Sequence, residues 1–114
     1  MDMHEYLQEF LDDARGSVEG VRQGIAKLQA NAADMEAIND VMRHFHTLKG
    51  TSGMMQFTPL SEFCLELEMQ YRTLQKEGKP ASAALLQRSL QAVDGIGKAL
   101  TVLGSGGPCP EHIA

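Results

Sequence analysis

The sequence of 114 residues lacks tryptophan, has only two cysteines and contains no long apolar run. Cys64 lies among apolar neighbours in FCLEL, and Cys109 lies in a Gly/Pro-rich segment. We therefore expect reduced thiols rather than a disulfide framework or a metal site. A membrane-spanning helix needs about 18 consecutive apolar residues, and the opening MDMHEYLQEF lacks the basic start of a signal peptide. We expect a cytoplasmic location and no direct membrane insertion.

Basic residues are also scarce: 10 lysines and arginines stand against 15 aspartates and glutamates, for a formal net charge of −5. They are scattered along the chain rather than gathered into a patch, which argues against nucleic acid as a partner. The length suits one domain with a modest core, and seven methionines share the apolar positions with few aromatic residues. These properties favour a single helical domain.

Four segments carry apolar residues at alternating steps of three and four, the spacing of one face of an α-helix. The segments run from Leu7 to Leu28, from about Asp34 to Met55, from Leu60 to Leu74 and from Leu86 to Leu103. With short turns between them, they predict an all-α fold, an antiparallel up-down four-helix bundle in residues 1–104. Residues 105–114 would form a flexible tail, a short extra C-terminal helix or the start of an interdomain linker.

Several residues are expected to set the ends and faces of these helices. Thr58 can cap the third helix, and Gly78 can end it. Gly16, Gly20 and Gly24 fall at a spacing of four on the side of the first helix opposite its apolar stripe. Because charged residues lie among them, we expect this side to face solvent, with some bending or fraying, rather than to form a partner groove.

The segment HFHTLKGTSGMMQF, residues 44–57, contains residues that are unusual in a helix. Each interior glycine costs about 0.5–1 kcal/mol relative to alanine, so the segment needs a reason to lack side chains. At 100° per residue, His46 lies at the shoulder of the apolar stripe, and Gly50 and Gly53 lie one and two turns beyond it on the same side. The two glycines would leave room for a bulky group beside the imidazole.

Lys49 follows His46 by one helical turn, so its ammonium can approach any group attached to the imidazole. An unprotonated imidazole is a nucleophile, and a phosphoryl group bound to it would carry negative oxygens that a lysine can neutralise. A lone histidine in such a place is usually a packed or half-exposed side chain. The combination of His46 with Lys49 and the two glycines instead favours reversible phosphoryl carriage. His44 points about 160° away, and we interpret it, with His4 and His112, as a surface residue.

His46, Lys49 and Gly50 reproduce the H-x-x-K-G core of histidine phosphotransfer (HPt) domains. The opening MDMHEYLQEFLDDAR also resembles the start of CheA-type chemotaxis histidine kinases, whose first domain is of this kind. The resemblance covers residues 1 to about 103. It implies that His46 accepts a phosphoryl group from ATP, bound with Mg to a separate histidine kinase catalytic domain. It further implies transfer to an aspartate of a CheY-like response regulator receiver domain, and association with membrane chemoreceptor arrays through other domains.

The resemblance also assigns a role to Glu68 on the following helix, where a glutamate of CheA-type domains holds the other ring nitrogen of the histidine. Such a carboxylate would fix the tautomer and make the imidazole more nucleophilic. The sequence departs from the family pattern at two positions. Gln56 stands where the family usually has glycine, and Leu65 stands where CheA-type domains often have a second histidine.

Met54, Met55 and Phe57 are candidates for an apolar surface on which a response regulator docks, because methionine adapts to varied partners. The sequence has no P-loop, so we expect this chain to bind no cofactor itself and not to be a complete kinase. The resemblance implies that it is the phosphoacceptor domain of a histidine autokinase.

Alternatives remain open on the sequence alone. The chain could be a free-standing HPt protein in a phosphorelay, or a non-catalytic helical interaction module. A metal-binding bundle is the least favoured alternative, because paired Glu-x-x-His patterns are missing, and we expect no metal ligand.

Overall fold

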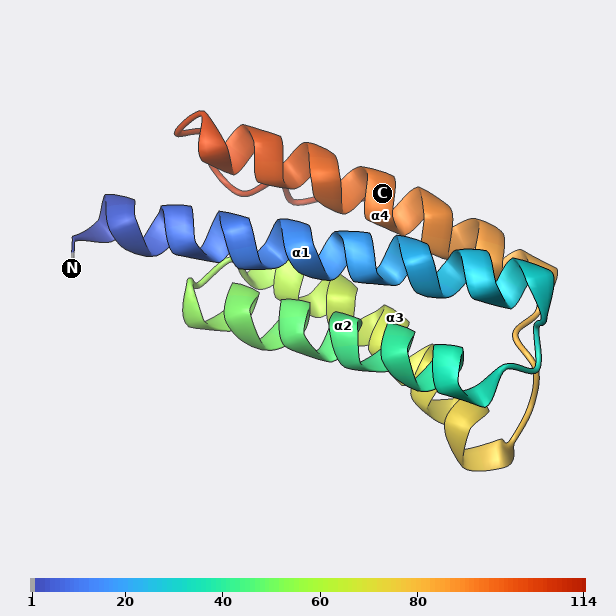
Figure 1. Ribbon diagram of the computed structural model, residues 1–114. Coiled ribbons are helices and arrows are strands. Elements are labelled where there is room, and N and C mark those ends of the chain that lie inside the picture. Colours follow the sequence, from blue (N-terminus) through green and yellow to red (C-terminus); the bar gives the residue numbers. More distant parts are fainter. Residues whose placement is uncertain (1) are drawn as a thin grey trace.

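Four helices run alternately up and down the long axis of the molecule in the computed structural model, which describes residues 2–114. They are α1 (Met3–Ala30), α2 (Met35–Met54), α3 (Thr58–Glu77) and α4 (Ala83–Gly104). The connecting loops alternate between the two ends of the molecule, so consecutive helices are antiparallel (Figure 1). Within residues 2–114 there is no strand. The predicted all-α, up-down four-helix bundle is confirmed.

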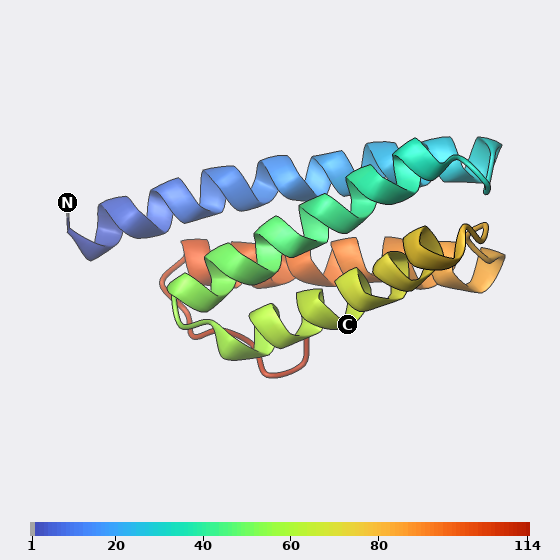
Figure 2. The same cartoon turned by 90° about the horizontal axis from the view of Figure 1, so that it is seen from below.

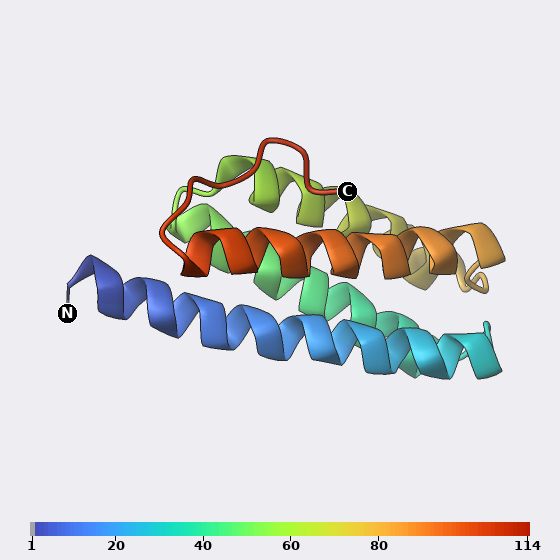
Figure 3. The ribbon, with the colours of Figure 1, turned by 90° about the horizontal axis from the view of Figure 1, so that it is seen from above.

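The first helix organises the bundle. Its 28 residues span about 42 Å at 1.5 Å per residue, nearly the 43 Å length of the molecule. It packs against both α2 and α4, whereas α3 packs mainly against α2. The first turns of α1 extend beyond the neighbouring helices in all three ribbon views (Figures 1, 2 and 3). None of the helices has a segment apolar and long enough to cross a bilayer, as far as residues 2–114 go.

Local capping explains where most helices begin and end. The side chains of Asp2, Asp34 and Ser82 each accept a hydrogen bond from a backbone N–H in the first turn of α1, α2 and α4. Gly78 ends α3 with φ of 64°, as predicted. The prediction that Thr58 caps α3 is wrong. Thr58 already lies inside the first turn with the proline that follows it, and the capping position belongs to residue 57, which makes no side-chain cap bond.

The core consists of the apolar faces of the four helices. Tyr71 is fully buried, stacks on Phe45 with ring centroids 6.0 Å apart, and shares a 2.6 Å hydrogen bond with the Ser89 hydroxyl. Burial raises the pKa of the Cys64 thiol to about 12, so this cysteine acts as a small apolar residue. The largest fully buried apolar side chains are Tyr71, Phe45, Leu11, Ile25, Leu28, Ile38, Leu48, Leu60, Leu67, Ile96 and Leu100.

The glycines of α1 depart from the expectation of a solvent face. Gly24 is buried, and a side-chain carbon added there would lie 2.5 Å from Cγ2 of Val41 on α2. A carbon added at Gly20 would overlap the imidazole of His44, which is therefore half-buried rather than a free surface residue. The expectation was wrong because α1 contacts helices on two sides, so its buried face is wider than one apolar stripe. Gly16 alone faces open space.

The last ten residues also differ from the expected flexible tail. They form no helix and fold back along the start of α3 and the side of α4 (Figures 2 and 3). Ile113 is buried, and its carbonyl oxygen occupies the position that a side chain at Gly95 would need. Cys109 is half-buried against the core. Because α3 and α4 contact each other little directly, this returning segment helps to cover the seam between them.

The turn between α2 and α3 contains a strained residue. Gln56 has φ of 64°, a conformation that costs an L side chain about 1 kcal/mol. Its N–H donates to the Gly53 carbonyl at 3.0 Å, and the N–H of Phe57 donates to the Ser52 carbonyl at 2.9 Å. This turn brings the ring of Phe57 edge-on to Phe10, with centroids 5.4 Å apart. The packing of Phe57 thus offsets the strain at Gln56.

The two kinds of glycine in α1 yield a matched test of this packing. Gly24→Ala should lower the free energy of unfolding by about 1–2 kcal/mol, because the stiff, buried Val41 side chain cannot move aside. Gly16→Ala should raise it by about 0.5–1 kcal/mol through helix propensity alone. Urea unfolding followed by circular dichroism measures both. Equal effects of the two substitutions would show that α1 and α2 do not approach at Gly24.

Candidate functional site

His46 lies on the side of α2 that borders α3, and its neighbours in the sequence explain its exposure. Phe45 and Leu48 are completely buried and fix the rotation of α2 about its axis. His46 lies between these buried residues and the solvent face of α2, and its side chain is 58% exposed. The helical pattern that predicted a histidine at the shoulder of the apolar stripe therefore describes its position correctly.

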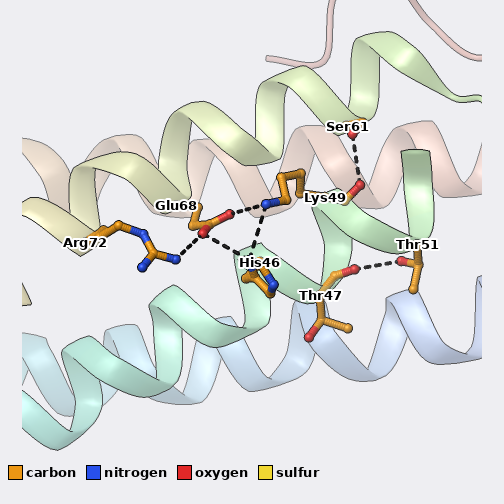
Figure 4. A network of polar contacts seen from close by, with 7 residues as sticks. All are labelled: His46, Thr47, Lys49, Thr51, Ser61, Glu68 and Arg72. Carbon is orange, nitrogen blue, oxygen red and sulfur yellow. Dashed lines mark hydrogen bonds and ion pairs between the residues drawn. The ribbon is translucent and has the colours of Figure 1, made fainter. Parts of the chain in front are cut away.

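A buried carboxylate on α3 holds the imidazole of His46. Glu68 Oε2 lies 3.0 Å from His46 Nδ1, although the Glu68 side chain is only 3% exposed. Two cations share the same carboxylate: Lys49 Nζ lies 3.2 Å from Oε1, and Arg72 Nη2 donates to Oε2 at 2.6 Å. Figure 4 shows Glu68 between Arg72 and Lys49, with the His46 ring beside them. The three residues proposed from the sequence thus meet in space.

The surrounding charges keep Glu68 ionised. Burial by itself would raise the pKa of this carboxyl, but hydrogen bonds from Arg72, His46 and Lys49 and the charge of Lys49 outweigh it. Together they lower the pKa from 4.5 to about 2. A buried carboxylate without such partners would be strongly destabilising. Glu68 is therefore a permanent hydrogen-bond acceptor at neutral pH.

The ionised carboxylate settles which ring nitrogen of His46 carries hydrogen. Nδ1 lies near both Glu68 Oε2 at 3.0 Å and Lys49 Nζ at 3.3 Å. One nitrogen cannot donate to the carboxylate and accept from the ammonium at the same time. The carboxylate contact is shorter and charge-assisted, and Lys49 already has Glu68 Oε1 as an anion partner, so Nδ1 donates its hydrogen to Glu68. Nε2 then carries the lone pair.

The other ring nitrogen of His46 is open to solvent. Nε2 makes no hydrogen bond with any of residues 2–114, and 58% of the His46 side chain is exposed. A side-chain carbon added at Gly50 would meet no atom within 4 Å, so internal packing does not require this glycine. Gly53 differs, because an added carbon would lie 3.3 Å from Ser61 Oγ on α3. Gly50 leaves external space, whereas Gly53 allows α3 to approach.

Met54, Met55 and Phe57 do not form one equally exposed surface. Met54 is 84% exposed, Met55 is half-buried, and Phe57 is half-buried against Phe10. The two methionines line a groove of about 240 Å³ between the start of α1 and the end of α2. The remaining residues of the groove are Tyr6, Glu9, Phe10, Asp13 and Thr51. The groove therefore combines apolar side chains with two carboxylates, and α2, the helix that carries His46, forms one of its walls.

Sequence reasoning missed Arg72, although one signal for it exists. Arg72 follows Glu68 by four residues on α3, the spacing at which a glutamate and an arginine meet on a helix surface. Such pairs are common on exposed helix faces, so the spacing gains significance only once Glu68 is known to be buried. No group of three or more histidines, cysteines, aspartates and glutamates in residues 2–114 is arranged to hold a metal ion.

Fold and site together define a class of protein: a helical bundle that presents one surface imidazole, oriented by a buried carboxylate. The family model of the Hpt domain matches residues 5–96. The chain belongs to the Hpt domain family, as the H-x-x-K-G core predicted.

Similar proteins include chemotaxis proteins. The chain is 32% identical over 68 residues to the chemotaxis protein CheA of Bacillus subtilis, which covers 60% of this chain and 10% of that protein. It is 26% identical over 110 residues to CheA of Treponema pallidum, covering 96% of this chain and 14% of that protein. The structure of the CheA phosphotransferase domain from Thermotoga maritima superposes with a TM-score of 0.86 at 28% identity, covering 90% of this chain and 98% of that one.

The lowered pKa of Glu68 leads to a test of stability against pH. A carboxyl that binds its proton less tightly in the folded than in the unfolded protein stabilises the fold above pH 4.5 and loses this contribution as the pH falls toward 2. Glu68→Gln should therefore reduce the free energy of unfolding by up to about 3 kcal/mol at pH 7. The difference between the two proteins should shrink steadily below pH 4.5. Urea unfolding at a series of pH values measures it, and a constant difference would contradict the assignment.

Proposed function

We propose that this domain is a phosphocarrier of chemotaxis-type two-component signalling, with His46 as the phosphoacceptor. The proposal rests on the different surroundings of the two ring nitrogens: Nδ1 is held by an ionised carboxylate, while Nε2 keeps an open lone pair. The likeness to CheA supports the same conclusion. Since the chain spans only 10–14% of these relatives, the kinase, the acceptor and ATP are parts of the proposal.

In the forward step, the Nε2 lone pair attacks the γ-phosphorus of ATP with Mg in a separate kinase catalytic domain. The bond from this phosphorus to the β–γ bridging oxygen breaks, and ADP leaves with the electron pair. The ring becomes a cation that keeps its hydrogen on Nδ1. Glu68 stabilises this cation through the existing hydrogen bond, and no proton has to move. Lys49 can leave Glu68 Oε1 and neutralise the new phosphoryl oxygens.

In the return step, a carboxylate oxygen of an aspartate in a response regulator attacks the phosphorus. The P–Nε2 bond breaks and its electron pair returns to the ring. The ring leaves as a neutral imidazole, because Nδ1 still carries its hydrogen. Glu68 therefore serves both directions of transfer: it favours the nucleophilic tautomer before the reaction and keeps the hydrogen on Nδ1, so that a neutral imidazole leaves after it. We place this exchange in the cytoplasm, close to receptor arrays that other domains would contact.

Replacement of His46 separates this function from that of a non-catalytic interaction module. His46→Gln should abolish labelling by an active histidine kinase domain with radiolabelled ATP while leaving helical content unchanged, because the ring is exposed. His44→Gln is the matched control and should be labelled as the wild type is. The product should be acid-labile and base-stable, as a phosphohistidine is. Full labelling of His46→Gln would refute the assignment.

We also propose that the groove between α1 and α2 receives the response regulator. Met54 lies about 12 Å along α2 from His46, within the footprint of one receiver domain. The carboxylates of Glu9 and Asp13, which line it beside apolar side chains, suit a partner that presents both basic and apolar side chains.

An apolar-to-charged change in this groove tests the docking proposal. Met54→Asp should slow phosphoryl transfer to the receiver domain by roughly fivefold or more, the effect of losing one central apolar contact. Met54→Leu keeps the apolar surface and should transfer at the wild-type rate. Labelling by the kinase domain, measured in parallel, shows whether His46 itself is intact. Wild-type transfer by Met54→Asp would place the docking surface elsewhere.

A further inference from the structure

Arg72 occupies a place that the proposed reaction has not yet used. Its guanidinium donates to Glu68 Oε2 at 2.6 Å, and this is the same oxygen that lies 3.0 Å from His46 Nδ1. Lys49 approaches the other carboxylate oxygen, Oε1. Arg72 therefore competes directly with the imidazole, whereas Lys49 does not (Figure 4).

We propose that Arg72 is a positioning residue of the phosphoacceptor site: by holding Glu68 Oε2, it limits the negative charge that Glu68 presents to the imidazole of His46. The inference rests on the proposed function and adds to it a residue that sets how firmly the ring holds positive charge. The unphosphorylated ring is neutral and the phosphorylated ring is a cation. Arg72 therefore affects the balance between accepting and releasing a phosphoryl group.

The physical argument follows from sharing one acceptor oxygen. A carboxylate oxygen that already accepts a short bond from a guanidinium is a weaker acceptor for a second donor. The hydrogen bond from Nδ1 is therefore weaker than it would be to an unshared carboxylate, and the protonated or phosphorylated ring is stabilised less. A less stabilised cationic ring is a better leaving group when the P–Nε2 bond breaks. Arg72 thus favours release to the acceptor aspartate.

A second consequence of Arg72 is mechanical. Glu68 is held from three directions, by Lys49 on Oε1 and by His46 and Arg72 on Oε2. Leu65, one turn before Glu68 on α3, offers no polar group, so Arg72 is the polar partner that α3 itself supplies. It keeps the carboxylate in place when Lys49 turns toward a phosphoryl group.

The opposing interpretation is that Arg72 forms an ordinary helix-surface ion pair of small effect. The molecule contains a suitable control for this interpretation. Arg88 on α4 donates to Glu66 Oε1 on α3 at 2.7 Å and is 47% exposed, compared with 41% for Arg72. The two arginines differ in what their glutamates touch: Glu68 binds the imidazole, and Glu66 makes no hydrogen bond or ion pair with His46.

The test is an NMR titration of the imidazole of His46 in the full unphosphorylated chain, with its signals assigned from His46→Gln. The charged groups around this ring are Lys49 from α2 and Glu68 and Arg72 from α3. Arg72→Met should move the titration midpoint upward by about half a pH unit, because Glu68 Oε2 then accepts from the ring alone while Lys49 stays on Oε1. Arg72→Lys should restore at least half of the shift. Arg88→Met should leave the midpoint unchanged.

Phosphotransfer supplies a second readout. The phosphorylated Arg72→Met protein should pass its phosphoryl group to a receiver domain roughly threefold more slowly, the upper limit for half a unit of leaving-group basicity. An unchanged midpoint in Arg72→Met, or an equal shift in Arg88→Met, would overturn the inference. The titration needs no phosphorylation, so it judges Arg72 independently of whether His46 is the phosphoacceptor.

Discussion

The ionised carboxylate of Glu68 is the interaction on which the site depends. A negative charge that is almost fully enclosed is tolerated only when cations and hydrogen-bond donors surround it. Here those partners are His46 and Lys49 from α2 and Arg72 from α3 itself. The need to satisfy one buried charge therefore ties two helices together and fixes the tautomer of the imidazole. Stability and chemistry have the same origin in this domain.

The bundle presents the imidazole by enclosing its neighbours. Phe45 and Leu48 are sealed in the core, and the ring of Tyr71 stacks on Phe45. This packing sets the rotation of α2 about its axis, so His46 lies at the edge of the core with Nδ1 toward Glu68. The bare backbone at Gly50 then adds space without weakening the packing beneath it. The buried packing thus holds α2 in position, while the missing side chain at Gly50 leaves space beside the imidazole.

Periodicity was sufficient to predict the four helices and the position of His46, because an apolar stripe fixes which residues turn inward. The resemblance supplied Glu68, which the periodicity could not place opposite His46 without knowing how α2 and α3 pack. Arg72 was missed for the same reason. The burial of Gly24 was missed because a single stripe cannot reveal that α1 has two neighbours. Thr58 failed as a cap because the turn at Gln56 starts α3 one residue earlier than the capping pattern suggests.

The carbonyl of Ile113 lodged against Gly95 affects where this domain can be trimmed. A truncation after Gly104 would follow the end of the last helix, yet it would remove Ile113 from beside Gly95 and Cys109 from the apolar core. Apolar atoms that the chain now shields would meet water, and such newly bared surfaces promote self-association. The shortened chain is thus expected to self-associate, so residues 105–114 belong to the smallest unit that keeps this apolar surface covered.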